Sequence, residues 1–240
     1  MTRHVTRNLT RLGIITGLAS EAKLARRAVK ELGLAEQVLV VCAGPGIERA
    51  EAAVRGLSQF GFNIVASFGL AGALVPGLRA GALIVPRLVV GADGPTLAVE
   101  QGLREKLLAV LGAAAREVRL LLSVSTIVSG AAAKSRLASE SGADAVDMES
   151  YGVARAAAGA GLPFVVLRAI ADPAERAIPK AAEAGLTPDG AVHALPVLLH
   201  ALMRPREIPE IMRLARDNAR AMASLRRAAR LALPFLLFNR

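Results

Sequence analysis

Strand-like apolar runs alternate with amphipathic, helix-like segments along most of the chain, and this alternation restricts the folds that the chain can adopt. The runs lie at 11–16, 37–41, 63–68, 82–90, 118–129, 143–148 and 163–171, and the helical patterns at 20–32, 47–60, 99–112, 131–140 and 149–160. Strands that are apolar at nearly every position must be covered on both faces. The pattern therefore predicts an α/β fold with a mixed, strongly bent central sheet flanked by helices.

A break in composition near residue 203 divides the chain into two parts. The 240 residues suit one large domain, predicted at 1–203, but MRPREIP (203–209) places two prolines before a final helical pattern. In that segment, 204–240, nine arginines stand against three acidic residues, so +6 of the net charge of +10 lies there. Apolar residues recur at helical spacing from 208 to 225, while Arg213, Arg216, Arg220 and Arg227 take the other side. Such a basic amphipathic helix can bind an anionic membrane interface or pack on the protein, and both readings are open.

Composition also excludes several classes of protein. Cys42 is the one cysteine, so an intrachain disulfide is impossible and a reducing, cytoplasmic location is expected. One Cys and three scattered His residues give no zinc-ligand spacing, and we expect no metal. The chain has neither a GxGxxG motif followed by the expected acid nor a GxxxxGK[ST] loop, and its basic residues lack interleaved aromatics. We therefore expect no dinucleotide cofactor and no nucleic-acid partner.

Acidic residues stand where predicted strands end and helices begin. DAVDMESY (144–151) carries Asp147 and Glu149 around Met148, IITGLASE (14–21) ends in Glu21, and LRAIADPAE (167–175) carries Asp172 before a proline. Function in α/β folds usually lies at such edges. Taken alone, the acids of DAVDMESY are as well explained by helix capping, and an Asp before Pro is more often a turn former.

Taken in order, these motifs resemble those of a known enzyme family. GIITGLASE resembles the start of bacterial methylthioadenosine/S-adenosylhomocysteine nucleosidases, and FGLAG resembles their Gly-X-Ala-Gly turn. VDMES resembles the family's Val-acid-Met-Glu signature, and RAIAD resembles its Arg-Ala-Ile-Ser-Asp strand end. The resemblance spans about 11–175 and implies the nucleoside phosphorylase/nucleosidase superfamily, its fold, and cleavage of an N-glycosidic bond.

The resemblance implies a role for each matching residue. Asp172 would be the general acid that protonates purine N7, and Glu21 would hold or deprotonate the attacking water. Glu149 would accept hydrogen bonds from the ribose 2′- and 3′-hydroxyls. Other residues implied to contact substrate are Met148, Gly69, Leu70, Gly72, Ser129 and Gly130. Asp147 is left as a cap or a structural acid.

The chain also departs from the family pattern. Leu70 stands where hydrolases commonly have a hydroxyl residue, and Ser67 and Leu70 replace the Arg and Thr that bind phosphate in the phosphorylase branch. Arg49 is a possible substitute, although a surface helix arginine is the commoner reading. SGAAAKS (129–135) lacks the base-stacking aromatic residue, and Ala171 replaces the serine before the catalytic Asp. Inorganic phosphate as a co-substrate, and hence hydrolysis or phosphorolysis, stays open.

An opened, alanine-lined pocket with a basic tail resembles the hopanoid-associated phosphorylase branch. That resemblance implies adenosylhopane as substrate, with release of adenine and formation of a ribosyl- or phosphoribosyl-hopane. With a lipid substrate expected, the basic amphipathic pattern of 207–240 suits peripheral contact with the inner face of the cytoplasmic membrane as well as it suits packing on the protein. We also expect a homo-oligomer, with a dimer favoured. Two alternatives are a soluble methylthioadenosine/S-adenosylhomocysteine nucleosidase and a non-catalytic membrane- or nucleic-acid-binding protein.

Overall fold

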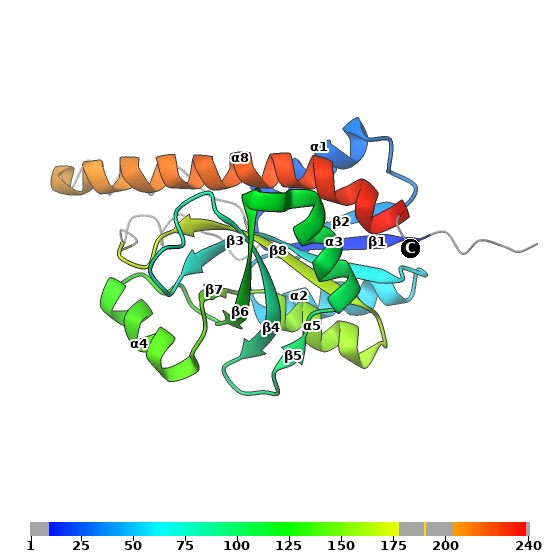
Figure 1. Ribbon diagram of the computed structural model, residues 1–240, viewed down its shortest axis with the longest axis horizontal. Coiled ribbons are helices and arrows are strands. Elements are labelled where there is room, and N and C mark those ends of the chain that lie inside the picture. The colour runs from blue at the N-terminus through cyan, green and yellow to red at the C-terminus, as the bar shows by residue number, and fades with distance from the viewer. Residues whose placement is uncertain (1–9, 178–189, 191–203, 239–240) are drawn as a thin grey trace, which may run out of the picture.

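A mixed sheet of eight strands forms the centre of the protein in the computed structural model, which describes residues 10–177, 190 and 204–238 (Figure 1). The strands follow the order β2-β1-β3-β7-β6-β4-β5, and β8 pairs with both β3 and β4. Their bounds are β1 Leu12–Thr16, β2 Val38–Cys42, β3 Ile64–Ala73, β4 Leu83–Gly91, β5 Leu97–Ala98, β6 Ala115–Ser123, β7 Ala145–Asp147 and β8 Phe164–Asp172. Because β8 runs parallel to β3 and antiparallel to β4, it bends the sheet towards closure.

Helices cover both faces of this sheet. Helices α1, α3 and α8 lie on one side, and α2 and α5 pack together on the other (Figure 1). The helices are α1 Ala19–Glu31, α2 Ile47–Ser58, α3 Gln101–Leu111, α4 Ala131–Ser141, α5 Ser150–Gly159 and α8 Ile208–Phe238, with short 3-10 helices at Gly112–Ala114 and Pro205–Glu207. Burial on both faces explains why strands such as β1 and β8 are apolar almost throughout. The predicted α/β class with a mixed, bent sheet is confirmed.

Two boundaries predicted from the sequence are wrong, one in the FGLAG segment of β3 and one at the end of β6. The FGLAG motif is not a turn, because β3 continues through Ala73 and pairs with β8 as far as Gly72. The run 118–129 is not a single strand, because β6 ends at Ser123, and the segment 124–130 leaves the sheet. Ser123 is the last residue of β6 to pair with β7, which is only three residues long.

Helix α8 packs on the protein along its C-terminal half. Its buried apolar side chains belong to the main hydrophobic core, among them Leu225, Leu233, Leu236 and Leu237. The LALPFLLF segment therefore contributes to the core. The N-terminal half is largely exposed and carries Arg213, Arg216 and Arg220 on its surface. Within 10–177 and 204–238, no helix has the length and apolar character needed to span a bilayer.

Candidate functional site

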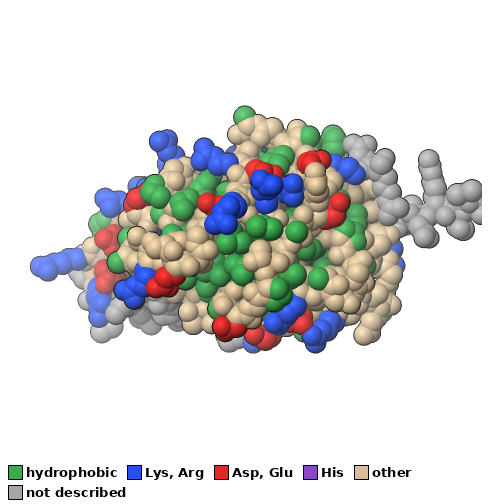
Figure 2. Space-filling model, turned by 60° about the horizontal axis from the view of Figure 1, so that its bottom comes forward, with side chains coloured by type: hydrophobic (Ala, Val, Ile, Leu, Met, Phe, Trp, Pro, Cys, Tyr) green, Lys and Arg blue, Asp and Glu red, His purple; other side chains and the backbone are tan. Residues whose placement is uncertain are grey.

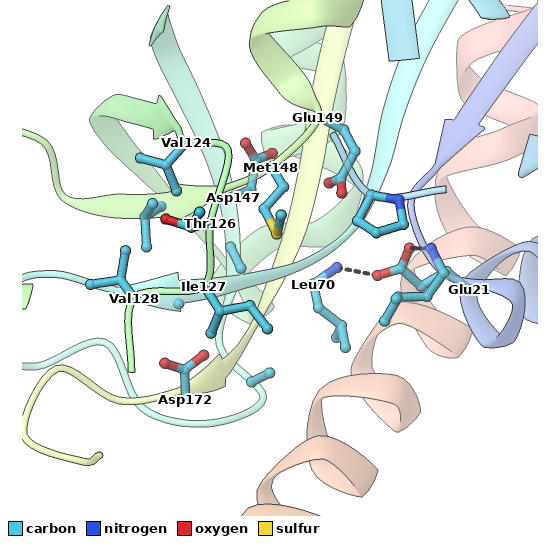
Figure 3. Close-up of a pocket in the computed structure, with 16 residues that line it drawn as sticks. Glu21, Leu70, Val124, Thr126, Ile127, Val128, Asp147, Met148, Glu149 and Asp172 are labelled. Carbon is cyan, nitrogen blue, oxygen red and sulfur yellow. Dashed lines mark hydrogen bonds between the residues drawn. The ribbon is translucent and has the colours of Figure 1, made fainter. Parts of the chain in front are cut away.

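A pocket of about 200 Å³ opens where β3, β7 and β8 come together beside the start of α1 (Figure 3). Its described lining residues are Leu18, Glu21, Pro45, Leu70, Ala71, Gly72, Val124, Thr126, Ile127, Val128, Val146, Asp147, Met148, Glu149, Ala171 and Asp172. Glu21 and Glu149 lie towards one end, whereas the carboxyl group of Asp172 lies at the other, beyond Ile127 (Figure 3). The wall between the two ends is mostly apolar.

A buried arginine organises the end that holds Glu21 and Glu149. Arg168, on β8, is 0% exposed. Its Nη2 lies 2.7 Å from Asp147 Oδ2 and 3.2 Å from Glu149 Oε2, and its Nη1 donates to the carbonyl oxygen of Leu70 at 3.3 Å. Burial of a guanidinium is tolerated only with such partners. Three carboxyl groups, counting Glu21, therefore line this end of the pocket, and one guanidinium is buried behind them.

The serine that replaces the phosphate-binding arginine belongs to the same cluster. Ser67 is fully buried, and its Oγ accepts a hydrogen bond from Arg168 Nη2 at 2.8 Å. It also lies 3.0 Å from the Oγ of Ser150, the first residue of α5. Ser67 thus supports Arg168 from behind and does not line the pocket.

Glu21 is held by backbone donors. Its Oε2 accepts from the N–H groups of Gly17 (3.1 Å) and Leu18 (2.9 Å), and its Oε1 accepts from the N–H of Leu70 (2.8 Å). Burial raises the pKa of Glu21, while the charge of Arg168 and these hydrogen bonds oppose the rise. A fixed carboxyl group with a raised pKa is suited to accept a proton from a bound water.

The two acids of DAVDMESY have different roles. Asp147 fits the capping reading, since its carboxylate accepts from the N–H of Ser150 at 3.3 Å and from the hydroxyl of Ser123 at 2.5 Å. Glu149 occupies the N-cap position of α5 but makes no side-chain capping hydrogen bond. Burial, followed by the neighbouring charges of Asp147 and Glu21, raises the pKa of Glu149 to about 8 against the opposing charge of Arg168. Glu149 therefore belongs to the pocket.

Asp172 ends β8 at the opposite end of the pocket and is paired with a lysine. Nζ of Lys134, from α4, forms an ion pair with Asp172 Oδ2, and Lys134 is 0% exposed. Burial raises the pKa of Asp172, and the ammonium of Lys134 partly opposes this rise. A carboxyl group with a raised pKa that faces a pocket is a candidate proton donor.

Glycines make room for these side chains. A Cβ on Gly69 would lie 2.5 Å from Arg168 Nη1 and 2.6 Å from Glu21 Oε1, closer than non-bonded atoms approach. A Cβ on Gly17 would collide with the carboxyl group of Glu149. Gly69, the first glycine of FGLAG, therefore does not form a turn. Its missing side chain leaves room for the buried side chains of Arg168 and Glu21 against strand β3.

The structure gathers most of the predicted residues around one pocket. Glu21, Leu70, Gly72, Met148, Glu149 and Asp172 all line it. Gly69 lies behind the lining in β3, and Ser129 and Gly130 follow Val128 outside the lining set. Arg49 is exposed on α2 and is likewise outside this set.

The sequence motifs implied no role for Arg168 or Lys134. Arg168 interrupts the apolar run 163–171, and a charge inside such a run is the signal that could have identified it. Lys134 sits in SGAAAKS, where nothing separates it from an ordinary surface lysine.

Several solved structures of nucleosidases and of a hydrolase superpose on this chain. A methylthioadenosine nucleosidase mutant of Helicobacter pylori, solved with 5′-methylthioadenosine in its active site, superposes with a TM-score of 0.63 at 20% identity, covering 69% of this chain and 87% of that one. Futalosine hydrolase of the same organism gives 0.64 at 19%, covering 95% and 96%. The 5′-methylthioadenosine/S-adenosylhomocysteine nucleosidase of Neisseria meningitidis gives 0.65 at 19%, covering 92% and 100%.

At these identities the structural neighbours show a shared fold. None of the curated proteins matches the chain in sequence. The family model described as "Phosphorylase superfamily" matches residues 21–195, well over half of the chain, from Glu21 through Asp172. The chain belongs to the phosphorylase superfamily.

Proposed function

We propose that this protein cleaves the N-glycosidic bond of an adenine nucleoside, with the ribose at the Glu21–Glu149 end of the pocket and the purine at the Asp172 end. The observation that carries the proposal is the arrangement of acids: three buried carboxyl groups share one guanidinium at one end, and a fourth carboxyl group faces the other end. Membership of the phosphorylase superfamily and the fold shared with nucleosidases support it.

The ribose end suits the charge that develops in the reaction. Cleavage of a glycosidic bond passes through an oxocarbenium-like sugar that carries positive charge. The ionised carboxyl groups of a buried site favour that charge over the neutral ground state. Glu149, which lines the pocket beside Met148, would hold the ribose hydroxyls, and Met148 would pack against the sugar.

The purine end suits protonation of the leaving group. Departure of adenine is assisted by a proton on N7, and the raised pKa of Asp172 keeps more of its carboxyl group protonated near neutral pH. Ala171, next to it in the lining, adds no competing polar group.

Water is the nucleophile that we favour over phosphate. Among the described residues lining the pocket, none is a lysine or an arginine, so a phosphate ion would meet carboxyl groups without a facing cation. Glu21 is positioned by three backbone donors to orient and deprotonate a water. Release of adenine without added phosphate is therefore expected.

An adenosyl lipid, adenosylhopane in the first instance, is the substrate that we propose. The described lining has no aromatic side chain to stack on the base, and Leu70, Ile127, Val124 and Val128 give the pocket apolar walls. A bulky apolar 5′ substituent suits such walls better than it suits polar ones. The experiment is to supply adenosylhopane in mixed micelles and methylthioadenosine in the same micelles at equal concentration, and to measure adenine with and without phosphate.

The outcomes of this experiment are distinct. Preference for adenosylhopane supports the lipid substrate, while preference for methylthioadenosine returns the protein to the soluble nucleosidases. Release that requires phosphate and yields a phosphorylated sugar would establish phosphorolysis. If wild type releases no more adenine from either substrate than an enzyme-free blank does, the proposed activity is wrong.

Peripheral membrane contact with a lipid substrate would use the exposed side of α8, and not the LALPFLLF side chains that are buried in the core, such as Leu233, Leu236 and Leu237. Arg213 and Arg216 are exposed there, next to Met212, which is 49% exposed. Replacing both arginines by Gln should weaken sedimentation with anionic vesicles about 30-fold, from about 1 kcal/mol per basic residue. Arg116→Gln with Arg136→Gln, two exposed arginines elsewhere, is the matched control.

A homodimer also stays a prediction. On the face that Figure 2 brings forward, apolar side chains gather near the centre and charged side chains lie around them. An apolar centre with a polar rim is typical of homodimer interfaces. Sedimentation equilibrium at micromolar concentration should give twice the mass of one chain.

A further inference from the structure

Helix α4 buries a lysine and no other residue. In 131–141, all of it described, Lys134 is the one buried residue, whereas its neighbours from Ala131 to Arg136 are exposed or half-buried. An amphipathic helix would normally place an apolar side chain at such a position. Because lysine is almost never fully buried without a partner, its partners must account for its presence.

All three N–H donors of the Lys134 ammonium have acceptors. One forms the ion pair with Asp172 Oδ2, and the others donate to the carbonyl oxygens of Pro173 (2.9 Å) and Arg176 (3.0 Å). An ammonium has three donors, so this one is fully satisfied and fixed in orientation. It fixes in turn one oxygen of Asp172 and the chain that follows β8.

Lys134 approaches Asp172 from outside the substrate pocket. Asp172 lines the pocket, and Lys134 does not. A nucleoside in the pocket would therefore meet Asp172 but not Lys134. The lysine can act on the reaction only through the carboxyl group that it holds.

We propose that Lys134 is the positioning residue that orients the carboxyl group of Asp172 and controls when that group carries a proton. This inference rests on the proposed function, in which Asp172 protonates the leaving purine. The ammonium holds Oδ2 and thereby leaves Oδ1 for the purine. Its positive charge also stabilises the ionised carboxylate, so it limits the pH range in which Asp172 is a proton donor.

The charges around this pair come from several elements, and all of them stay in place when Lys134 alone is replaced. From the pocket side they are Glu21, Asp147 and Glu149 with Arg168. Behind Asp172, a second cavity of about 220 Å³ is lined by Asp172, Glu175, Arg176, Ala177, Glu210, Arg213, Leu214 and Asp217. In it, Arg176 pairs with Asp217 of α8.

Replacing Lys134 by Met removes the charge and keeps most of the length of the side chain. An opposite charge in contact lowers the pKa of a carboxyl group by about 1–3 units. Without the charge of Lys134, Asp172 should therefore keep its proton to a higher pH. In Lys134→Met, the pH at which kcat for adenine release falls on the alkaline side should move up by at least about one unit. At low pH, where Asp172 is protonated in both proteins, kcat should be about 10- to 100-fold lower because the carboxyl group is no longer held. Lys134→Arg should keep the limb near its wild-type pH, and Arg136→Met is the matched loss of a cation on the same helix.

A second measurement does not depend on turnover. The ¹³C carboxyl resonance of Asp172, assigned by its loss in Asp172→Asn, should titrate at least about one pH unit higher in Lys134→Met than in wild type. Because breaking a buried ion pair can destabilise a protein, Lys134→Gln, which keeps amide donors for the two carbonyl oxygens, is the second neutral variant. An unchanged titration of Asp172 in either folded variant overturns the proposal.

The two measurements separate this proposal from the proposed function. If the Asp172 resonance shifts and the kcat limb does not follow, Lys134 controls the proton but that proton does not control turnover, and the proposal is overturned in its catalytic part. If wild type releases no adenine at all, the proposed function fails while the titration still tests the Lys134–Asp172 pair. Equal loss of kcat at every pH with an unshifted resonance means that Lys134 only supports the fold.

Discussion

Replacing Glu149 by Gln should stabilise the protein at alkaline pH while it disables the ribose end of the pocket. Burial, followed by the charges of Asp147 and Glu21, raises the pKa of Glu149 from 4.5 to about 8. The folded protein therefore binds a proton that the unfolded chain releases above pH 4.5, and stability is lost as the pH rises from 4.5 towards 8. Each pH unit in this window lowers the free energy of unfolding by about 1.4 kcal/mol.

Gln has the shape of the protonated acid and cannot ionise. The free energy of unfolding of Glu149→Gln therefore does not fall with rising pH through this group. Relative to wild type, its free energy of unfolding should rise by about 2–4 kcal/mol between about pH 5 and pH 8 and level off above about pH 8. Urea unfolding followed by circular dichroism at unit pH steps and constant ionic strength measures the difference. Glu140→Gln, at an exposed position on α4, supplies the effect of the amide substitution without burial.

The sign of the result decides between the two readings of DAVDMESY. A carboxylate that caps α5 would be stabilised by the helix N-terminus, its pKa would be lowered, and Gln would destabilise the protein at alkaline pH. A difference that is flat with pH, or a Gln variant that becomes relatively less stable as pH rises, would refute the raised pKa of Glu149 and its placement in the pocket rather than at the cap.

Three further predictions concern Asp172 at the other end of the pocket, Gly69 in strand β3 and the C-terminal helix α8. Asp172→Asn should lower kcat for adenine release by about 10²–10⁴ with the fold intact by circular dichroism, and near-wild-type turnover would reject the acid role. Gly69→Ala should cost at least about 10²-fold in kcat/KM, because its Cβ would displace Arg168 and Glu21, while Gly159→Ala, which meets no neighbour, is the control. Leu225→Ala, at a position 0% exposed, should lower the free energy of unfolding by about 2–5 kcal/mol, whereas a change below about 0.5 kcal/mol would mean that α8 does not pack on the core.

The fold could be predicted from the sequence because strands buried on both faces have an unmistakable pattern. Runs such as 37–41 and 163–171 coincide with β2 and β8 to within about one residue. The same pattern failed at Ser123, where an apolar segment leaves the sheet to line the pocket. An apolar pocket wall and an apolar strand use the same residues, so periodicity cannot separate them.

Within the site, sequence motifs predicted the acids but not the cations that hold them. Glu21, Glu149 and Asp172 stand where strands end and helices or loops begin, and the sequence pattern marks such places. The roles of Arg168 and Lys134 depend on contacts across the sheet, from Arg168 to Asp147 and from Lys134 to Asp172. These partners are separated by 21 and 38 residues in sequence, and no local rule links them.

Helix α8 shows the same limit at the level of a whole element. A helix with one apolar and one basic side is expected both at a membrane surface and at the edge of a core, and the sequence does not distinguish them. The structure buries Leu225 and Leu233 in the main core and leaves Arg213 and Arg216 at the surface. Deleting the helix would therefore test folding, since it removes core side chains together with the charge. Only substitution of the exposed arginines, with α8 left in place, can test whether this side of the protein binds an anionic membrane.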